Sequence, residues 1–274
     1  MIDRLQMYVE WLQADPLDFV IYMAYTIAVV LISLILHECA HGYVALKCGD
    51  PTAKMLGRLS LNPLRHLDPI GTLSMFLLGF GWAKPVPVNP RNFRDLRRDD
   101  FFVSIAGIVT NLTLCIVSLV LATVVHCFLW EKNFIILYKD VFGSAEGLMN
   151  VFGSGEASSW ALNIAYGGSF EGLEVYMRNG WLLYVQRFLL LLADVNLGLA
   201  IFNLLPVPPL DGFHLLNDTI LKGRLQLDGQ LFRITQVILI VLMLSGTLNT
   251  VLYAANEFVG SALVRTIMMI GGQL

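Results

Sequence analysis

The sequence contains little charge for its length. Asp, Glu, Lys and Arg make up 14% of its 274 residues, whereas 56% of the residues are hydrophobic. An average soluble domain is about 25% charged, and the mean hydropathy of +0.67 is far from that balance. This composition excludes an ordinary soluble domain and predicts a multi-pass membrane protein that has the lipid bilayer as a partner. A basic patch with interleaved aromatic residues is also lacking, so we expect no nucleic-acid partner.

Paired cysteines and a secretory signal are lacking as well. The four cysteines, at positions 39, 48, 115 and 127, form no C-x-x-C pair and lie in or beside apolar runs. We therefore expect reduced packing residues rather than a disulfide framework. The N-terminus shows no basic region followed by a small-residue cleavage site, so we expect the first apolar run to be retained in the cell membrane.

Long apolar runs are abundant instead. Four of them carry at most one charge and are long enough to cross about 30 Å of hydrocarbon as helices; they are residues 19–36, 101–130, 188–206 and 234–256. A fifth run, residues 69–83, is short and rich in glycine, which favours a re-entrant segment. The expected fold class is an all-α polytopic membrane protein: a helix bundle of about four full spans plus the re-entrant segment, and a small extended β element near the cytosolic face.

The distribution of charge predicts which segments face the cytosol. Lysines and arginines cluster in residues 47–65 and 84–98, and the positive-inside rule assigns both clusters to the cytoplasm. Residues 131–180 carry six acidic and three basic side chains, so we expect an external loop there. Within it, residues 143–159 predict a flexible stretch, either a lid that gates access or, more commonly, a solvated connector. We expect one membrane-embedded domain over residues 1–274, with its core in 19–220.

The most specific motif is His37-Glu38-Cys39-Ala40-His41, at the end of the first run. Histidines four residues apart lie on one helix face, where both can bind one metal ion, and Glu38 can accept a proton from water bound to that ion. This pattern is typical of metal-assisted hydrolysis. In the alternative, His37 and His41 are packing residues at a helix interface and bind nothing. We favour the metal site, because three ionisable groups within five residues are costly at membrane depth.

A catalytic zinc ion normally has three protein ligands, so a third donor is required. The glutamates of residues 131–180 are on the wrong side if that segment is external. Asp211 is the better candidate, because it follows a proline-rich break just beyond the cytosolic end of the run 188–206. Such breaks are tolerated at membrane depth only against protein or a watery cavity. The alternative is that Asp211 caps the helix that follows.

Two separated motifs resemble those of the site-2 protease family of intramembrane zinc metalloproteases: His37-Glu38-x-x-His41 and Asn203-x-x-Pro206-x-Pro208-x-x-Asp211-Gly212. Residues 57–63 and 81–90 resemble the compact prokaryotic branch that has no PDZ or CBS domain. The likeness covers roughly residues 19–220. It implies a zinc metalloendopeptidase that hydrolyses peptide bonds within or near transmembrane segments of membrane-tethered regulatory proteins, with a transmembrane protein as substrate and the active site near the cytosolic side.

The resemblance also implies roles for individual residues. One Zn²⁺ ion would be held by His37, His41 and Asp211, with Glu38 as the catalytic general base. Asn203 and Asn111 would bind the substrate or the developing oxyanion. The sequence departs from the family at Gly107-Ile108-Val109-Thr110-Asn111, which lacks the proline that often follows the glycine.

Two other functions stay open, a membrane zinc-binding carrier and a non-catalytic partner protein. A carrier needs ligands across the bilayer, whereas the donors here cluster at one depth. A non-catalytic partner protein would not need the general base Glu38. Residues 53–62 are interpreted either as an extended edge that pairs with an unwound substrate or as a plain surface turn. The sequence does not specify an oligomeric state or a particular substrate.

Further polar residues have structural roles as the default expectation. Asp194 and Arg187 lie two turns apart, so we expect a buried ion pair or a bundle contact. His66 and Asp68 are expected to anchor the re-entrant segment rather than to act as spare ligands or proton shuttles. His214, three residues after Asp211, is expected to be an interfacial or capping residue.

Overall fold

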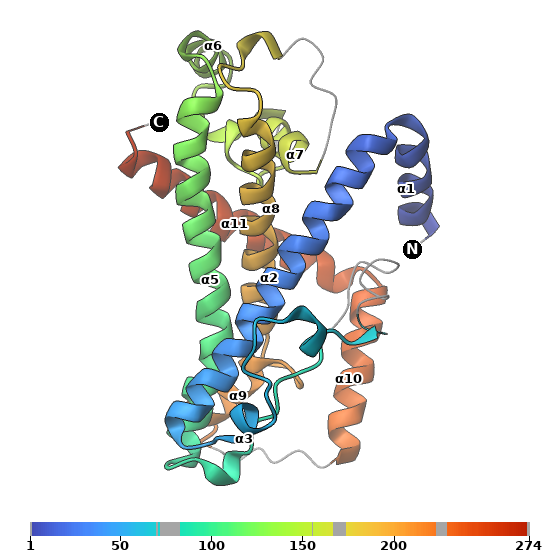
Figure 1. Cartoon of the computed structure of the whole chain (residues 1–274), viewed down its shortest axis with the longest axis vertical. Coiled ribbons are helices and arrows are strands. Elements are labelled where there is room, and N and C mark those ends of the chain that lie inside the picture. Colours follow the sequence, from blue (N-terminus) through green and yellow to red (C-terminus); the bar gives the residue numbers. More distant parts are fainter. Residues whose placement is uncertain are drawn as a thin grey trace. The chain divides into compact units, whose positions relative to one another are not determined.

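The computed structural model describes residues 2–69, 71, 83–154, 156–166, 174–222 and 229–272. These residues are mainly helical, as expected, and Figure 1 shows the order of the elements. The α-helices are α1 (Ile2–Ala14), α2 (Pro16–Cys48), α3 (Thr52–Met55), α5 (Leu96–Leu129), α6 (Lys132–Phe142), α7 (Ser159–Tyr166), α8 (Leu182–Asn203), α9 (Asp211–Thr219), α10 (Gly229–Leu244) and α11 (Thr247–Ile270). Short 3-10 helices are η1 (Pro63–Arg65), η2 (Pro90–Asn92), η3 (Glu146–Leu148), η4 (Glu156–Ser158) and η5 (Glu174–Tyr176).

Three helices of the described residues, α2, α5 and α8, are long and apolar enough to cross a membrane. They coincide with the first three apolar runs and confirm that part of the prediction. Helix α8 ends at Asn203, three residues before Pro206, because proline lacks the N–H that a continuing helix requires.

The fourth expected span, residues 234–256, is wrong as a single helix. The chain breaks between α10 and α11, where Gly246 has a φ of +76°. This left-handed conformation costs glycine little and ends a helix. Helix α10 has 16 residues, about 24 Å, which is shorter than the hydrocarbon core. The described residues therefore contain three candidate spans instead of about four.

The re-entrant segment at residues 69–83 lies mostly outside the described residues. Its flanks are paired with each other: the backbone N–H of Lys84 donates to the carbonyl of His66 at 2.8 Å, and an isolated antiparallel bridge joins Leu67 to Ala83. Within the part of the chain that the structure describes, isolated bridges are the only β contacts.

The extended edge expected at residues 53–62 is not a strand. The segment begins inside α3 and then turns at Gly57, which has a φ of +63°. Buried Asp50 holds this region in place, because its carboxylate accepts from the Thr52 backbone N–H at 3.1 Å and from the Asn92 amide at 2.7 Å. These local hydrogen bonds favour a short helix over an extended strand.

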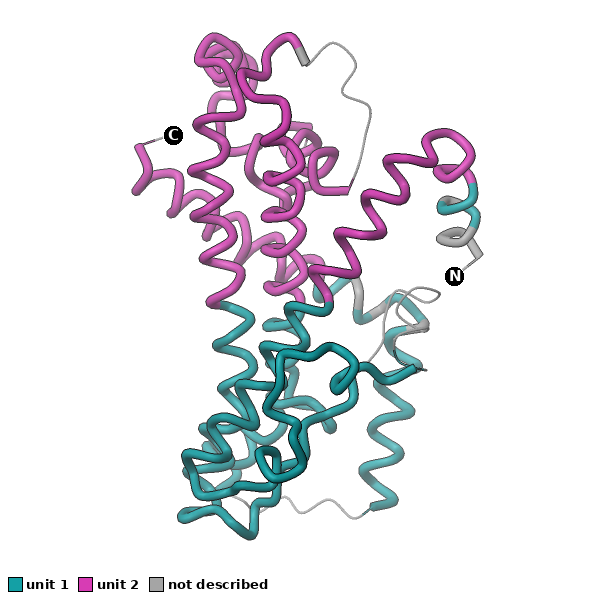
Figure 2. Tube along the Cα trace, in the orientation of Figure 1, with its two compact units in different colours: residues 1–9, 31–112, 199–252 teal, residues 10–30, 113–198, 253–274 magenta. Residues whose placement is uncertain are grey.

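The described chain divides into two compact units, which Figure 2 distinguishes by colour. Unit 1 comprises residues 1–9, 31–112 and 199–252, and unit 2 comprises residues 10–30, 113–198 and 253–274. All six predicted site residues belong to unit 1.

In unit 2, the described part of residues 143–159 is not solvated throughout in the way that its glycines and serines predict. Residues 147–153 are buried, and the first turns of this region pack with α7. Asn150 donates from its amide to the Ser261 hydroxyl of α11 at 3.0 Å, and Arg265 of the same helix pairs with Glu146 at 3.1 Å. Apolar side chains such as Leu148 and Phe152 supply the buried contacts, and they outweigh the local preference for a loop.

Arg187 and Asp194 of α8 have partners, but they do not pair with each other. Arg187 pairs with Asp18 of α2 at 2.6 Å, and its Nε atom donates to the Ile164 carbonyl at 2.9 Å. Asp194 accepts a hydrogen bond from the Tyr166 hydroxyl. The expected bundle contacts are therefore present, whereas an Asp194–Arg187 ion pair does not form.

Candidate metal centre

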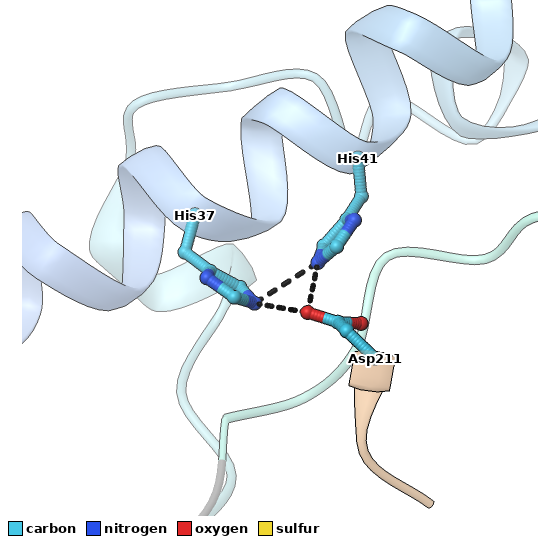
Figure 3. A group of neighbouring side chains, drawn as sticks. All are labelled: His37, His41 and Asp211. Atoms are coloured by element: carbon cyan, nitrogen blue, oxygen red, sulfur yellow. Dashed lines mark hydrogen bonds and ion pairs between the residues drawn. The ribbon is translucent and has the colours of Figure 1, made fainter. Parts of the chain in front are cut away.

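Two imidazoles and one carboxylate converge in unit 1 (Figure 3). The Nε2 atoms of His37 and His41 lie 2.9 Å apart. Oδ2 of Asp211 lies 3.4 Å from Nε2 of His37 and 3.3 Å from Nε2 of His41. Both histidines are buried, and the Asp211 side chain is 19% exposed. The structure thus brings together the three residues that the sequence predicts as metal ligands.

The geometry fits a zinc ion. Bonds of about 2.0–2.2 Å in a tetrahedral arrangement set ligand atoms roughly 3.3 Å apart, close to the observed 2.9, 3.3 and 3.4 Å. Oδ2 of Asp211 is buried and faces the two Nε2 atoms without a well-aligned hydrogen bond to either. A buried carboxylate oxygen is costly unless a cation compensates it. Two nitrogens and one oxygen form a donor set typical of catalytic zinc.

Helix α2 presents the two histidines because they are one turn apart on the same face. That face packs against α5 at Gly107. A Cβ atom at Gly107 would lie 2.4 Å from Cε1 of His37 and 2.5 Å from Nε2 of His41. Only glycine therefore allows the helix backbone to approach both imidazoles so closely.

The proline-rich turn after α8 positions Asp211. The turn folds back so tightly that a Cβ atom at Gly212 would lie 2.3 Å from the carbonyl oxygen of Leu204. Asp211 is the first residue of α9, the N-cap residue is Leu210, and the cap has no side-chain hydrogen bond. The capping alternative for Asp211 is therefore wrong, and its carboxylate points to the histidines instead (Figure 3).

The two imidazoles keep Asp211 in the charged form. Burial raises the pKa of this carboxyl, but the nearby His37 and His41 outweigh burial and hold the pKa below its usual range. A carboxylate that is ionised at neutral pH is the form that binds a metal ion.

Glu38 contacts the irregular segment that precedes η2. Its Oε2 atom accepts a hydrogen bond of 2.7 Å from the backbone N–H of Val86. Val86 is buried, and its neighbours Pro85 and Pro87 have no N–H to donate. This contact fixes one carboxylate oxygen and leaves the second to take a proton.

The two predicted substrate-binding asparagines have different surroundings. The amide of Asn111 in α5 lies 3.1 Å from Nδ1 of His37. The amide of Asn203 donates to the carbonyl of Leu199, one turn earlier in α8, at 3.0 Å. Sequence reasoning missed the backbone contact between the carbonyl of Val103 and Nδ1 of His41, at 2.7 Å. The regular four-residue spacing of Val103, Gly107 and Asn111 is the signal that could have indicated this face of α5.

The remaining predicted polar residues lie at structural contacts. One ring nitrogen of His66 lies 2.7 Å from the carbonyl of Ser60, and Asp68 accepts from the Gly71 N–H at 2.8 Å. His214 of α9 pairs with Asp100 of α5 at 3.0 Å.

Comparisons with known proteins identify similar sequences. The sequence matches the model of peptidase family M50 over residues 25–246. "Putative zinc metalloprotease YwhC" of Bacillus subtilis is 35% identical over 201 residues, which cover 73% of this chain and 71% of the relative. "Putative zinc metalloprotease Rip2" of Mycolicibacterium smegmatis is 32% identical over 117 residues, which cover 40% of this chain and 45% of the relative.

A protein with that same name from Mycobacterium tuberculosis is 30% identical over 133 residues, which cover 44% of this chain and 51% of the relative. The chain thus matches about half the length of the mycobacterial relatives. No solved structure matches it significantly. Because the family model covers most of the sequence, the chain belongs to peptidase family M50, the site-2 protease family of membrane-embedded zinc metalloproteases.

Proposed function

We propose that this protein is an intramembrane zinc endopeptidase that cleaves membrane-tethered regulatory proteins within or near their transmembrane segments. The observation that carries the proposal is the convergence of His37, His41 and Asp211 at ligand-to-ligand distances suited to one zinc ion, with Glu38 next to the first ligand in sequence. Three helices able to span a bilayer support a membrane location. The substrate class comes from the family alone.

The residues of the site divide the chemistry between them. When bound, a zinc ion would supply a Lewis acid that polarises the scissile carbonyl and acidifies a water molecule. Glu38 takes the proton of the attacking water and passes it to the leaving amine. The Val86 N–H holds one oxygen of Glu38, which orients the other for this transfer.

Asn203 is proposed to donate to the developing oxyanion. Its amide now donates to the Leu199 carbonyl within α8, so the side chain has to rotate before it reaches a substrate. The chain after Asn203 is not helical. Non-helical backbone at membrane depth is tolerated where it lines a water-filled cavity, which a hydrolytic site requires.

The active site is proposed to lie near the cytosolic side of the cell membrane. The basic cluster at residues 47–65 follows Glu38, and the basic cluster at residues 84–98 contains Val86. The positive-inside rule favours a cytosolic location for both clusters. A substrate helix would have to unwind locally at this depth, so we expect preferred substrates to contain weak helix formers near the cleaved bond.

Cleavage of a tagged single-span substrate tests the proposal. The wild type, Glu38→Gln and Glu156→Gln are compared in cells, with zinc content measured on each purified protein. Glu156 is exposed, so its variant makes the same charge change away from the site. We expect Glu38→Gln to lower cleavage by about 10²-fold or more while zinc is retained, and Glu156→Gln to behave as wild type.

The tag on the cytosolic end of the substrate should appear in a soluble cytosolic fragment. Equal cleavage by the wild type and Glu38→Gln would overturn the proposal that this protein is the protease. Zinc flux across vesicles that is unchanged by Glu38→Gln, in the absence of cleavage, would favour the carrier instead.

A further inference from the structure

One face of α5 contacts both metal-binding histidines. Val103, Gly107 and Asn111 are spaced by four residues and therefore lie on the same side of the helix. Val103 contributes its backbone carbonyl, 2.7 Å from Nδ1 of His41, and Gly107 contributes the close backbone approach. Asn111 is fully buried, with 0% of its surface exposed, and its amide lies 3.1 Å from Nδ1 of His37.

The direction in which the imidazoles face determines where their protons are. Both Nε2 atoms point to Oδ2 of Asp211, so they are the atoms that donate electron pairs to a metal ion. A neutral imidazole that binds a metal through Nε2 carries its proton on Nδ1, and that N–H needs an acceptor. The carbonyl of Val103 is the acceptor for His41. His37 requires an equivalent oxygen.

Asn111 can supply that oxygen. Its amide nitrogen and oxygen are interchanged by a half-turn about the last side-chain bond. In the orientation described, the nitrogen faces His37 and the oxygen is buried without a hydrogen-bond partner. After the half-turn, the Asn111 oxygen faces Nδ1 of His37 and accepts a hydrogen bond from the Nδ1 proton. The Asn111 amide can thus hydrogen-bond to Nδ1 of His37 whether or not that atom carries a proton. The Val103 carbonyl can only accept, so it requires a proton on Nδ1 of His41.

We propose that Asn111 is a positioning residue of the metal centre, whose side-chain oxygen accepts the Nδ1 proton of His37 and so directs Nε2 to the ion. This role differs from the substrate contact that the family resemblance implies for Asn111. The inference rests on the proposed function, since it requires that His37 bind zinc.

Zinc affinity, measured by competition with a chelator on the purified protein, tests this role without relying on activity. Asn111→Leu keeps a side chain of similar size but removes the acceptor, and Asn111→Asp keeps an acceptor. Loss of such a contact typically weakens metal binding about 10–100-fold. We expect Asn111→Leu to raise the zinc dissociation constant by this factor and Asn111→Asp to bind zinc within about threefold of the wild type, because aspartate is a common partner of a zinc-bound imidazole.

Asn196→Leu is the matched control. Asn196 is likewise fully buried in a long helix, and its amide donates to the Leu192 carbonyl at 2.8 Å. We expect this variant to keep wild-type zinc affinity, and the thermal midpoint of each variant in detergent checks its folding. Purely structural loss at position 111 would weaken zinc binding in the aspartate variant as much as in the leucine variant.

The outcomes separate the two proposals. Wild-type affinity in Asn111→Leu, or equal weakening in Asn111→Leu and Asn111→Asp, overturns the positioning role while the metal site stands. A wild-type protein that binds no zinc overturns the metal centre itself and the positioning role with it.

Discussion

One charged side chain in each unit, Arg187 in unit 2 and Asp211 in unit 1, is neutralised in a different way. In unit 2, the buried guanidinium of Arg187 is paired with Asp18 at 2.6 Å, so protein supplies both charges. In unit 1, Asp211 faces only two imidazoles among the described residues, and no lysine or arginine pairs with it there. The Asp211 carboxylate and the two imidazole nitrogens therefore converge at a point where no described lysine or arginine supplies a positive charge.

This difference distinguishes a structural polar contact from a metal centre. A buried ion pair whose charges cancel stabilises only the fold, and its loss leaves one charge unpaired. A set of donors without a cation gains stability from an ion that comes from outside, so the binding energy adds to folding. The two kinds of site are therefore expected to respond to substitution with different readouts.

Breaking the ion pair in unit 2 is expected to give the largest loss of stability. Asp18→Asn leaves the guanidinium of Arg187, which is 3% exposed, without its carboxylate. Removing one partner of a buried pair costs about 3–5 kcal/mol, and we expect a value near the lower end because Asp18 is 22% exposed. The unfolding midpoint in detergent measures the loss.

Zinc bound per folded molecule should stay at the wild-type level in Asp18→Asn. Asp140→Asn, at an exposed position of α6, is the control and should keep the wild-type midpoint. An unchanged midpoint for Asp18→Asn would show that unit 2 does not depend on this pair.

Gly107→Ala is expected to have the opposite pattern in unit 1. The added methyl group would lie 2.4 Å from His37 and 2.5 Å from His41, so at least one imidazole has to move. Overpacking of this kind costs about 1–3 kcal/mol, and we expect zinc affinity to fall about tenfold or more because ligand geometry is tightly constrained.

Gly198→Ala provides the comparison from unit 2. A Cβ atom at this helical glycine would lie 3.4 Å from the Asn256 amide nitrogen, an ordinary contact distance. The variant should keep both stability and zinc affinity. Wild-type zinc affinity in Gly107→Ala would contradict the close packing of α5 against the histidines.

Local sequence patterns predicted the three candidate ligands and the helix break after α8. His37 and His41 are one helical turn apart whatever the tertiary structure, so their shared face follows from spacing alone. The prolines at positions 206, 208 and 209 predicted a helix break there, and α8 ends three residues earlier than the predicted run, at Asn203. Asp211 was found by elimination and by position, and its contact with the histidines agrees with that choice.

Contacts that depend on tertiary packing were not predictable. The Ser245-Gly246 pair lies inside a continuous apolar run, and only the backbone conformation reveals the break. Arg187 and Asp194 are close in sequence, yet the partner of Arg187 is Asp18 on another helix. The role of Asn111 similarly depends on how α5 packs against α2, which sequence spacing does not specify.

The smallest predicted effect concerns the attachment of α9, the helix that begins with Asp211, to α5. Burial and the neighbouring Asp100 raise the pKa of Asp218 to about 6, and Asp100 raises the pKa of His214. Both groups are more readily protonated in the folded state. Their contribution to stability is therefore present at low pH, and it is lost as the pH rises through about 6 for Asp218 and through the raised pKa for His214.

Asp218→Asn should therefore stabilise the protein at pH 8, where Asp218 has lost its proton beside Asp100, and change little at pH 4. The expected gain is about 0.2–1 kcal/mol, the scale of a charge pair that water screens, because the Asp100 side chain is 21% exposed. Unfolding midpoints of both proteins in detergent at the two pH values measure it. The backbone carbonyl of Asp218, which accepts from Arg97 at 2.9 Å, is kept in the variant. A gain that is equal at both pH values would mean that packing rather than charge limits this contact.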